Sequence, residues 1–237
     1  MIMQTIVVVS IAMAIPVLAT PVRASSQQNA VIDPVSVSPD KFKVLLENEH
    51  ARVVEYMLDP GERDEWHTHP PKASYVVSGG TIRITLADGS SFDSEEKAGT
   101  ATWMNALPRH FARNVGRTSV RIVLVEPKSD GFPTASCELD PALVNPTSII
   151  VKLENDSVRV MEAVLPPGFK EKLHTHPGYV MYILDGGTVR LHSTDRPTRN
   201  SEFKTGNVFY SDPITHWAEN TGTTTIRVML VELRRRP

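Results

Sequence analysis

The stretch GERDEWHTHPPKASYVVSGG, residues 61–80, is the main indication of the fold, because the same pattern returns as GFKEKLHTHPGYVMYILDGG at residues 168–187. Both copies carry His-x-His between spaced glycines. Side chains alternate across a β-strand, so the two histidines of each pair project from one face. Each pair therefore offers half of a metal site, and the other half must come from another strand.

The chain has eight histidines, and six of them fall into two matching sets, each a His-x-His pair with one further histidine downstream. The sets are His67, His69 and His110 in the first copy and His174, His176 and His216 in the second. Three histidines that converge on one cavity need hydrogen-bond partners or a metal to satisfy their ring nitrogens. We therefore expect two independent three-histidine metal sites. The alternative is a pair of emptied sites whose histidines remain as polar core residues.

The duplication extends well beyond these motifs. Residues 47–83 and 154–190 align at an offset of 107, with 17 identities in 37 positions. Downstream, one residue is missing from the second copy, so RHFARN at 109–114 aligns with THWAEN at 215–220 at an offset of 106. A period of this length indicates two whole domains rather than a solenoid repeat.

Short runs of β-branched residues bounded by Gly, Pro, Asn and Asp recur along each half, and no amphipathic helix of three turns is evident. The sequence therefore predicts an all-β protein with domains at 41–127 and 148–233. The segment 128–147, rich in Pro, Ser and Asp, is predicted to link them. Because each half is near the lower size limit for an independent core, we expect the two to bury a face against each other.

At these residues the chain resembles the cupin family, and its duplication resembles a bicupin. The family's first motif is Gly, five residues, His-x-His, three or four residues, Glu, six residues, Gly. The matching glycines are Gly61 and Gly80 in the first copy and Gly168 and Gly187 in the second. The resemblance implies two tandem jelly-roll β-sandwiches. The family's Glu position falls at Ala73 and Val180, so the carboxylate ligand is replaced in both copies.

Three neutral imidazoles leave the double charge of a divalent metal uncompensated, so such a centre favours anionic or chelating ligands. Open coordination positions are typical of catalytic sites. The arrangement resembles that of cupin dioxygenases and equally matches a zinc site that activates water. The sequence does not distinguish Fe, Mn, Ni, Cu and Zn.

Two functions stay open. One is a metal-dependent oxidoreductase, dioxygenase-like, that acts on a small oxygenated molecule. The other is a non-catalytic small-molecule binding or sensing bicupin, which is favoured by the absence of an evident acid or base beside the triads.

Further candidates lie near the first motif and its copy. Tyr75 and Tyr182 stand two residues beyond the Glu position and on its strand face, where they could bond to a metal-bound ligand as catalytic residues. The alternative is that both are core aromatics. Lys72, Arg109 and Arg113 are expected to draw an anionic substrate to the first site.

The composition and the N-terminal segment of the chain indicate where the protein is located and which partners it does not bind. A formal net charge of −2 with no basic stripe argues against nucleic acid. Residues 6–18 are apolar except Ser10 and precede Val22-Arg23-Ala24. This pattern predicts a signal peptide at 1–24 and a periplasmic or secreted protein. The run is shorter than the roughly 20 residues of a membrane span, although an uncleaved anchor is the alternative. The sequence leaves open whether the chain forms a homo-oligomer.

Overall fold

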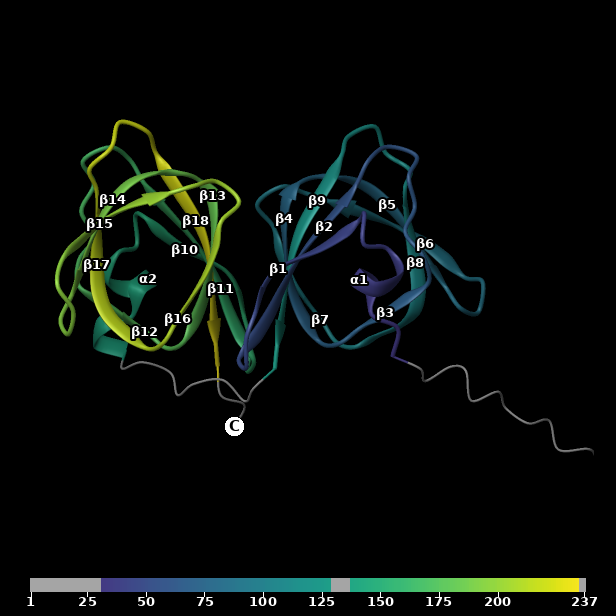
Figure 1. Cartoon of the computed structure of the whole chain (residues 1–237), viewed down its shortest axis with the longest axis horizontal. Helices are drawn as coiled ribbons and strands as arrows, with labels where there is room; N and C mark the ends of the chain where they lie inside the picture. Colours follow the sequence, from purple (N-terminus) through teal and green to yellow (C-terminus); the bar gives the residue numbers. More distant parts are fainter. Residues whose placement is uncertain (1–30, 129–136, 235–237) are drawn as a thin grey trace, which may run out of the picture. The chain divides into compact units, whose positions relative to one another are not determined.

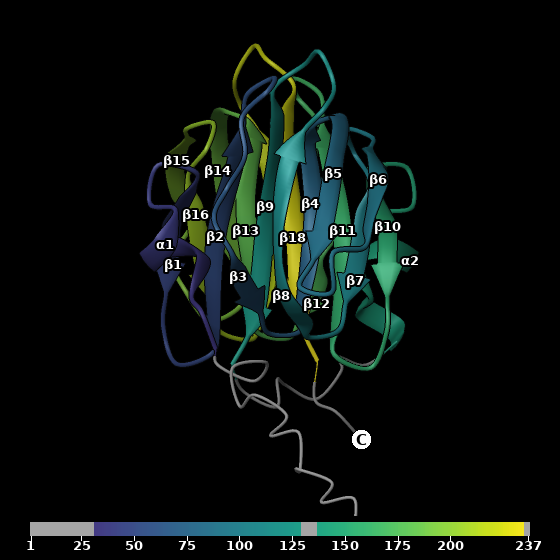
Figure 2. The ribbon, with the colours of Figure 1, turned by 90° about the vertical axis from the view of Figure 1, so that its right-hand side faces the viewer.

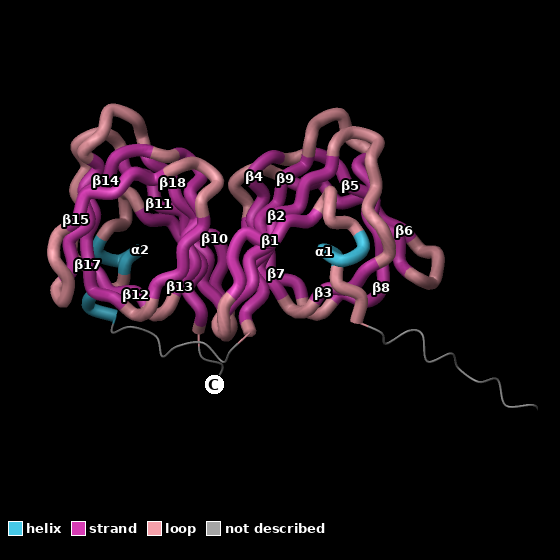
Figure 3. Tube along the Cα trace, in the orientation of Figure 1, coloured by secondary structure: helices cyan, strands magenta, loops and turns pink. Residues whose placement is uncertain are grey.

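Antiparallel strands make up most of the computed structural model, which describes residues 31–128 and 137–234 (Figures 1 and 3). The helices of the described residues are short: α1 (Pro34–Val37), α2 (Pro141–Val144) and the 3-10 turn η2 (Cys137–Leu139). No helix in this part of the chain is long and apolar enough to cross a membrane. The expected all-β class is confirmed, whereas the expected signal peptide lies outside the described residues.

Each half contains a five-stranded and a four-stranded antiparallel sheet. Figure 2 shows the strands running roughly side by side. In the first half, the larger sheet has the order β1 (Phe42–Glu47), β2 (Ala51–Leu58), β9 (Val120–Pro127), β4 (Lys72–Ser78) and β7 (Ala101–Met104). The smaller has the order β3 (His67–His69), β8 (Leu107–Asn114), β5 (Gly80–Leu86) and β6 (Ser91–Glu96). One apolar cluster joins the two sheets, since it contains Val54 of β2 and Ile84 of β5. The half is therefore a β-sandwich.

The second half repeats this topology strand by strand. Its larger sheet has the order β10 (Ile149–Glu154), β11 (Val158–Leu165), β18 (Ile226–Leu233), β13 (Tyr179–Asp185) and β16 (Val208–Ser211). Its smaller sheet has the order β12 (His174–His176), β17 (Ile214–Asn220), β14 (Gly187–Ser193) and β15 (Arg199–Phe203). The two tandem sandwiches predicted from the sequence are confirmed.

Another apolar cluster contains residues of both halves, including Val125 and Val231. Two tyrosines of this shared core reach across it in a reciprocal way. The Tyr75 hydroxyl donates to Glu162 Oε2 at 2.9 Å, and the Tyr182 hydroxyl donates to Glu55 Oε1 at 3.3 Å. The halves thus share a buried face, as their small size led us to expect.

The structural repeat begins before the strands. Asp33 caps the N-terminus of α1, and Asp140 caps that of α2. Each of these carboxylates also accepts hydrogen bonds from an arginine of the following hairpin, Arg52 and Arg159 respectively. The repeat therefore includes part of the segment expected as a linker at 128–147. The domain limits 41–127 and 148–233 remain predictions.

The change of offset from 107 to 106 between the two copies corresponds to a β-bulge in the first half. In the second half, His174 lies opposite His216 and His176 lies opposite Ile214. In the first half, His67 lies opposite His110, but His69 lies opposite Leu107, so β8 carries one extra residue as a bulge. The bulge absorbs the insertion and keeps the third histidine opposite the first.

Candidate metal centres

All six predicted histidines come together in two groups of three. In each half, the His-x-His strand (β3 or β12) pairs with the strand that carries the third histidine (β8 or β17). Within each group the candidate ligand nitrogens lie within 4.8 Å of one another. Among the described residues, neither group includes a carboxylate at this distance.

Backbone carbonyls hold the outer nitrogen of three of these rings. The pairs are His67 Nδ1 with Glu65 O at 2.7 Å, His110 Nδ1 with Pro108 O at 2.7 Å, and His174 Nδ1 with Lys172 O at 2.8 Å. A carbonyl oxygen can only accept, so each Nδ1 carries the proton and each Nε2 offers a lone pair. Metal-ligating histidines are oriented in this way by their outer partners.

Burial keeps these rings neutral. It lowers the pKa of His110 to about 4 and that of His174 to about 4. It also places the pKa of His216 well below its ordinary value. The Nε2 atom of His216 is buried without a hydrogen-bond partner among the described residues. An unpartnered, neutral ring nitrogen facing two others fits a metal ion.

One glutamate lies behind the second histidine of each His-x-His pair. Glu232 Oε1 lies 2.8 Å from His176 Nδ1, whereas Glu126 Oε1 lies 3.8 Å from His69 Nδ1. Both glutamates are buried. We did not predict them, although the matching Val-Glu at 125–126 and 231–232 was a usable signal.

Other carboxyl groups line the cavity in front of each triad, among them Asp64 in the first half and Glu171 in the second. Asp64 is buried, and burial raises its pKa. Burial also raises the pKa of Glu171 to about 7. The expectation that no acid or base stands beside the triads is therefore wrong.

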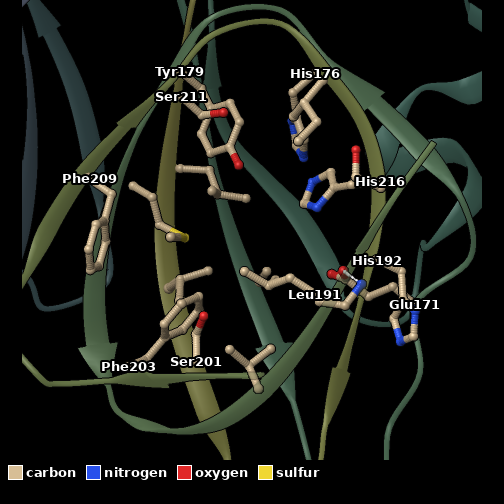
Figure 4. A pocket seen from close by; sticks show the side chains of 18 of the residues that line it. Glu171, His176, Tyr179, Leu191, His192, Ser201, Phe203, Phe209, Ser211 and His216 are labelled. Carbon is tan, nitrogen blue, oxygen red and sulfur yellow. Dashed lines mark hydrogen bonds between the residues drawn. The ribbon is translucent and has the colours of Figure 1, made fainter. Parts of the chain in front are cut away.

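The cavities in front of the triads differ in size. The volume is about 310 Å³ in the first half and about 890 Å³ in the second. In the first half, Phe42 and Tyr56 stack at 4.4 Å between ring centroids and line the cavity. Their counterparts at the offset of 107 are the smaller Ile149 and Ala163, which contribute to the larger second cavity. Figure 4 shows that cavity, with His176 and His216 beside Tyr179.

Tyr75 and Tyr182 do not line either cavity, which corrects the catalytic role expected for them. Lys72 and Ser74 line the first cavity, so alternation along β4 turns Tyr75 to the opposite face. In β13 the inward residues include Tyr179, and Tyr182 again faces the shared core. Sequence reasoning missed Tyr179, whose ring centroid lies 4.7 Å from that of His176.

The cations expected near the first triad are also placed differently. Lys72 lines the first cavity, and burial lowers its pKa to about 8. Arg109 packs instead over a tryptophan ring at 5.3 Å, and Arg113 is exposed. The arginines that line a cavity are Arg196 and Arg199, both in the second half. Arg109 and Arg113 therefore do not line the first cavity, and their attraction of an anionic substrate stays a prediction.

No protein-family model matches the sequence, and no curated protein matches it. Solved structures do share the fold. AerE from Microcystis aeruginosa is 13% identical with a TM-score of 0.60, and the match covers 88% of this chain and 99% of that one. A Bacillus subtilis oxalate decarboxylase variant is 15% identical with a TM-score of 0.59, covering 82% of this chain and 72% of that one.

A third solved structure is the formate complex of Lactobacillus farciminis oxalate decarboxylase, which is 15% identical with a TM-score of 0.55. The match covers 79% of this chain and 78% of that one. At these identities the likeness concerns the fold alone. The cupin resemblance is thus confirmed as a two-domain cupin fold.

Proposed function

We propose that this chain is an exported, metal-binding bicupin that acts on a small oxygenated molecule as a dioxygenase-type oxidoreductase. The observation that carries the proposal is the second-half triad, whose three imidazoles line a cavity of about 890 Å³. A cavity of this size is typical of small-molecule sites. Export is proposed from the sequence of residues 1–24 alone.

One divalent ion would be held in each half by His67, His69 and His110 or by His174, His176 and His216. Such an ion acts as a Lewis acid toward ligand oxygen atoms, and the donor set does not select among iron, manganese, nickel, copper and zinc. Around the second triad, Leu191, Phe203 and Phe209 supply apolar walls, and Glu171 supplies a carboxyl group that can accept a proton.

A non-catalytic binding role is the second candidate function, and the first half favours it. The stacked rings of Phe42 and Tyr56 reduce that cavity, and the buried amine of Lys72 lines it. A cation in the same cavity repels a metal ion, because both are positively charged. On this reading the chain binds a small molecule without turnover in either half.

Metal analysis and turnover together test the proposal. The wild-type chain should carry two metal ions, and His69→Ala and His176→Ala should each lower this to one, because two imidazoles hold a metal far less tightly than three. Oxygen uptake should be screened with aromatic diols, diketones and keto acids. Activity should disappear in His176→Ala and persist in His69→Ala.

Loss of both metals from either single variant would contradict independent sites. Two bound metals without turnover of any of these substrates would favour the binding role.

A further inference from the structure

The two halves differ in the hydrogen bonds made by a cavity-lining carboxyl group, which belongs to Asp64 in the first half and to Glu171 in the second. In the first half, the Tyr56 hydroxyl donates to Asp64 Oδ2 at 2.8 Å, and the Ala112 N–H donates to Asp64 Oδ1 at 2.7 Å. Both oxygen atoms of this buried carboxyl are therefore occupied. At the offset of 107, Asp64 corresponds to Glu171 and Tyr56 to Ala163.

Glu171 keeps only half of this arrangement. The Ala218 N–H donates to Glu171 Oε2 at 3.0 Å, the counterpart of the bond to Asp64. Because Ala163 has no hydroxyl, no group takes the place of Tyr56, and Oε1 has no hydrogen bond or ion pair among the described residues. Glu171 is half-buried, so its Oε1 is free to accept a hydrogen bond from a ligand in the cavity.

The space that Tyr56 fills in the first half is open in the second. Ala163 and Glu171 both line the second-half cavity. The side chain missing from this space is a phenol, that is, an apolar ring with one hydroxyl group directed at the carboxyl. Most of the remaining wall is apolar, including Leu191, Phe203 and Phe209 (Figure 4).

We propose that the second-half cavity binds a phenol-type ligand whose hydroxyl group donates to Glu171 Oε1, as Tyr56 does to Asp64 in the first half. The proposal names the ligand class of the same site and so rests on the proposed function for its location. Glu171 selects for the hydroxyl group, and the apolar walls select for the ring.

Two fluorescent probes that differ in one methyl group test this on the zinc-loaded, full-length protein. They are 2-naphthol, which can donate a hydrogen bond, and 2-methoxynaphthalene, which cannot. At a pH above the pKa of about 7 of Glu171, where its carboxylate is ionised, wild type should bind 2-naphthol at least about tenfold more tightly, the usual gain from a hydrogen bond to a charged group. Equal affinities would overturn the proposal.

Glu171→Gln should remove this preference. The Ala218 N–H requires an acceptor, so the amide oxygen is expected to turn to it and the amide NH₂ to face the cavity, where it cannot accept. Affinity for 2-naphthol should fall at least about tenfold, and affinity for 2-methoxynaphthalene should not fall. A preference retained in Glu171→Gln would overturn the proposal.

The location is tested by restoring the missing ring. Ala163→Tyr should abolish 2-naphthol binding, whereas the matched change Tyr56→Phe in the first half should leave it unchanged. Retained binding in Ala163→Tyr would place the ligand elsewhere and overturn the proposal. If Ala163→Tyr does not fold, the affinities of Glu171→Gln for 2-naphthol and 2-methoxynaphthalene still test the proposal.

Metal content measured on the same samples separates the two proposals. Two ions per chain without a preference for 2-naphthol would refute the phenol ligand alone. A chain that holds no metal would refute the proposed function, and the probe comparison on that chain would still decide the role of Glu171.

Discussion

Glu126 and Glu232 occupy matching positions but contact their histidines differently. Glu232 accepts from His176 Nδ1 at 2.8 Å, and no hydrogen bond joins Glu126 to His69, since the atoms lie 3.8 Å apart. Both His69 Nδ1 and Glu126 Oε1 are buried without partners among the described residues. A carboxylate bonded to the outer nitrogen orients the ring and makes it a stronger ligand.

Glu232→Gln should therefore weaken metal binding at the second triad by about 10- to 100-fold. The matched change Glu126→Gln should weaken binding at the first triad less, because its hydrogen bond is not formed. Competition with a chelator measures each site separately, in a His69→Ala background for the second triad and a His176→Ala background for the first. Equal losses at the two sites would contradict this reading.

The histidines could be predicted from the sequence, whereas the matching Val-Glu pairs marked the glutamates as repeated residues but not as contacts of a histidine. His-x-His on a strand places both rings on one face by alternation alone, and the duplication marks the third member. Glu232 meets His176 across 56 residues of sequence. That contact depends on how the two sheets pack face to face, which no local pattern reports.

Alternation also explains the error at Tyr75. His67 and His69 face the cavity from β3, but Lys72 and Ser74 face it from β4. The phase of alternation changes at the turn Pro70-Pro71, where the chain passes from the smaller sheet to the larger one. A pattern counted through that turn assigns every later side chain to the wrong face.

Helix α2 precedes the second sandwich, and its N-terminal cap is connected to the second triad through a chain of charged side chains. Asp140 caps α2 and pairs with Arg159, whose guanidinium lies 3.9 Å from Glu232. Burial acts to raise the pKa of Asp140, but the hydrogen bonds and charge of Arg159 outweigh it, and the net result is a lowered pKa. Folding therefore favours the ionised carboxylate.

Asp140→Asn should lower the free energy of unfolding by about 1–2 kcal/mol at pH 7, since it removes the charge that pairs with Arg159. The contribution is fully present above the ordinary aspartate pKa of about 4. It disappears as the pH falls through the lowered folded value.

Urea unfolding of the metal-free protein at pH 7 and near pH 3 measures the difference between wild type and variant. A difference that stays constant across this range would exclude the ionic origin.

The strands could be predicted from their alternation, but α1, α2 and the bulge in β8 could not. A helix of four residues is too short to show helical periodicity. The insertion in the first copy was visible as a change of offset, yet its position between Leu107 and His110 emerged only from the strand pairing.

The shared core makes the stability of each half depend on the other. It contains fully buried residues from both halves, among them Val53, Val123, Val160 and Val231. Each half alone would expose its side of this cluster, and an exposed apolar face of this kind destabilises a small domain or recruits a partner.

A chain of residues 31–128 should therefore melt at a lower temperature than the full-length protein, or should dimerise through the exposed face. Calorimetry and sedimentation of the same sample distinguish the two. A monomeric half that melts with the full-length protein would show that the shared core contributes little.

The reciprocal bonds of Tyr75 to Glu162 and of Tyr182 to Glu55 have the form of a homodimer interface, in which residue i of one copy meets residue j of the other and the reverse. In a homodimer, every substitution occurs twice, so neither cavity could change without the other. Joining two copies in one chain removes that coupling. The duplicated gene could then keep a filled cavity at Tyr56 and open its twin at Ala163 while conserving a single surface of contact.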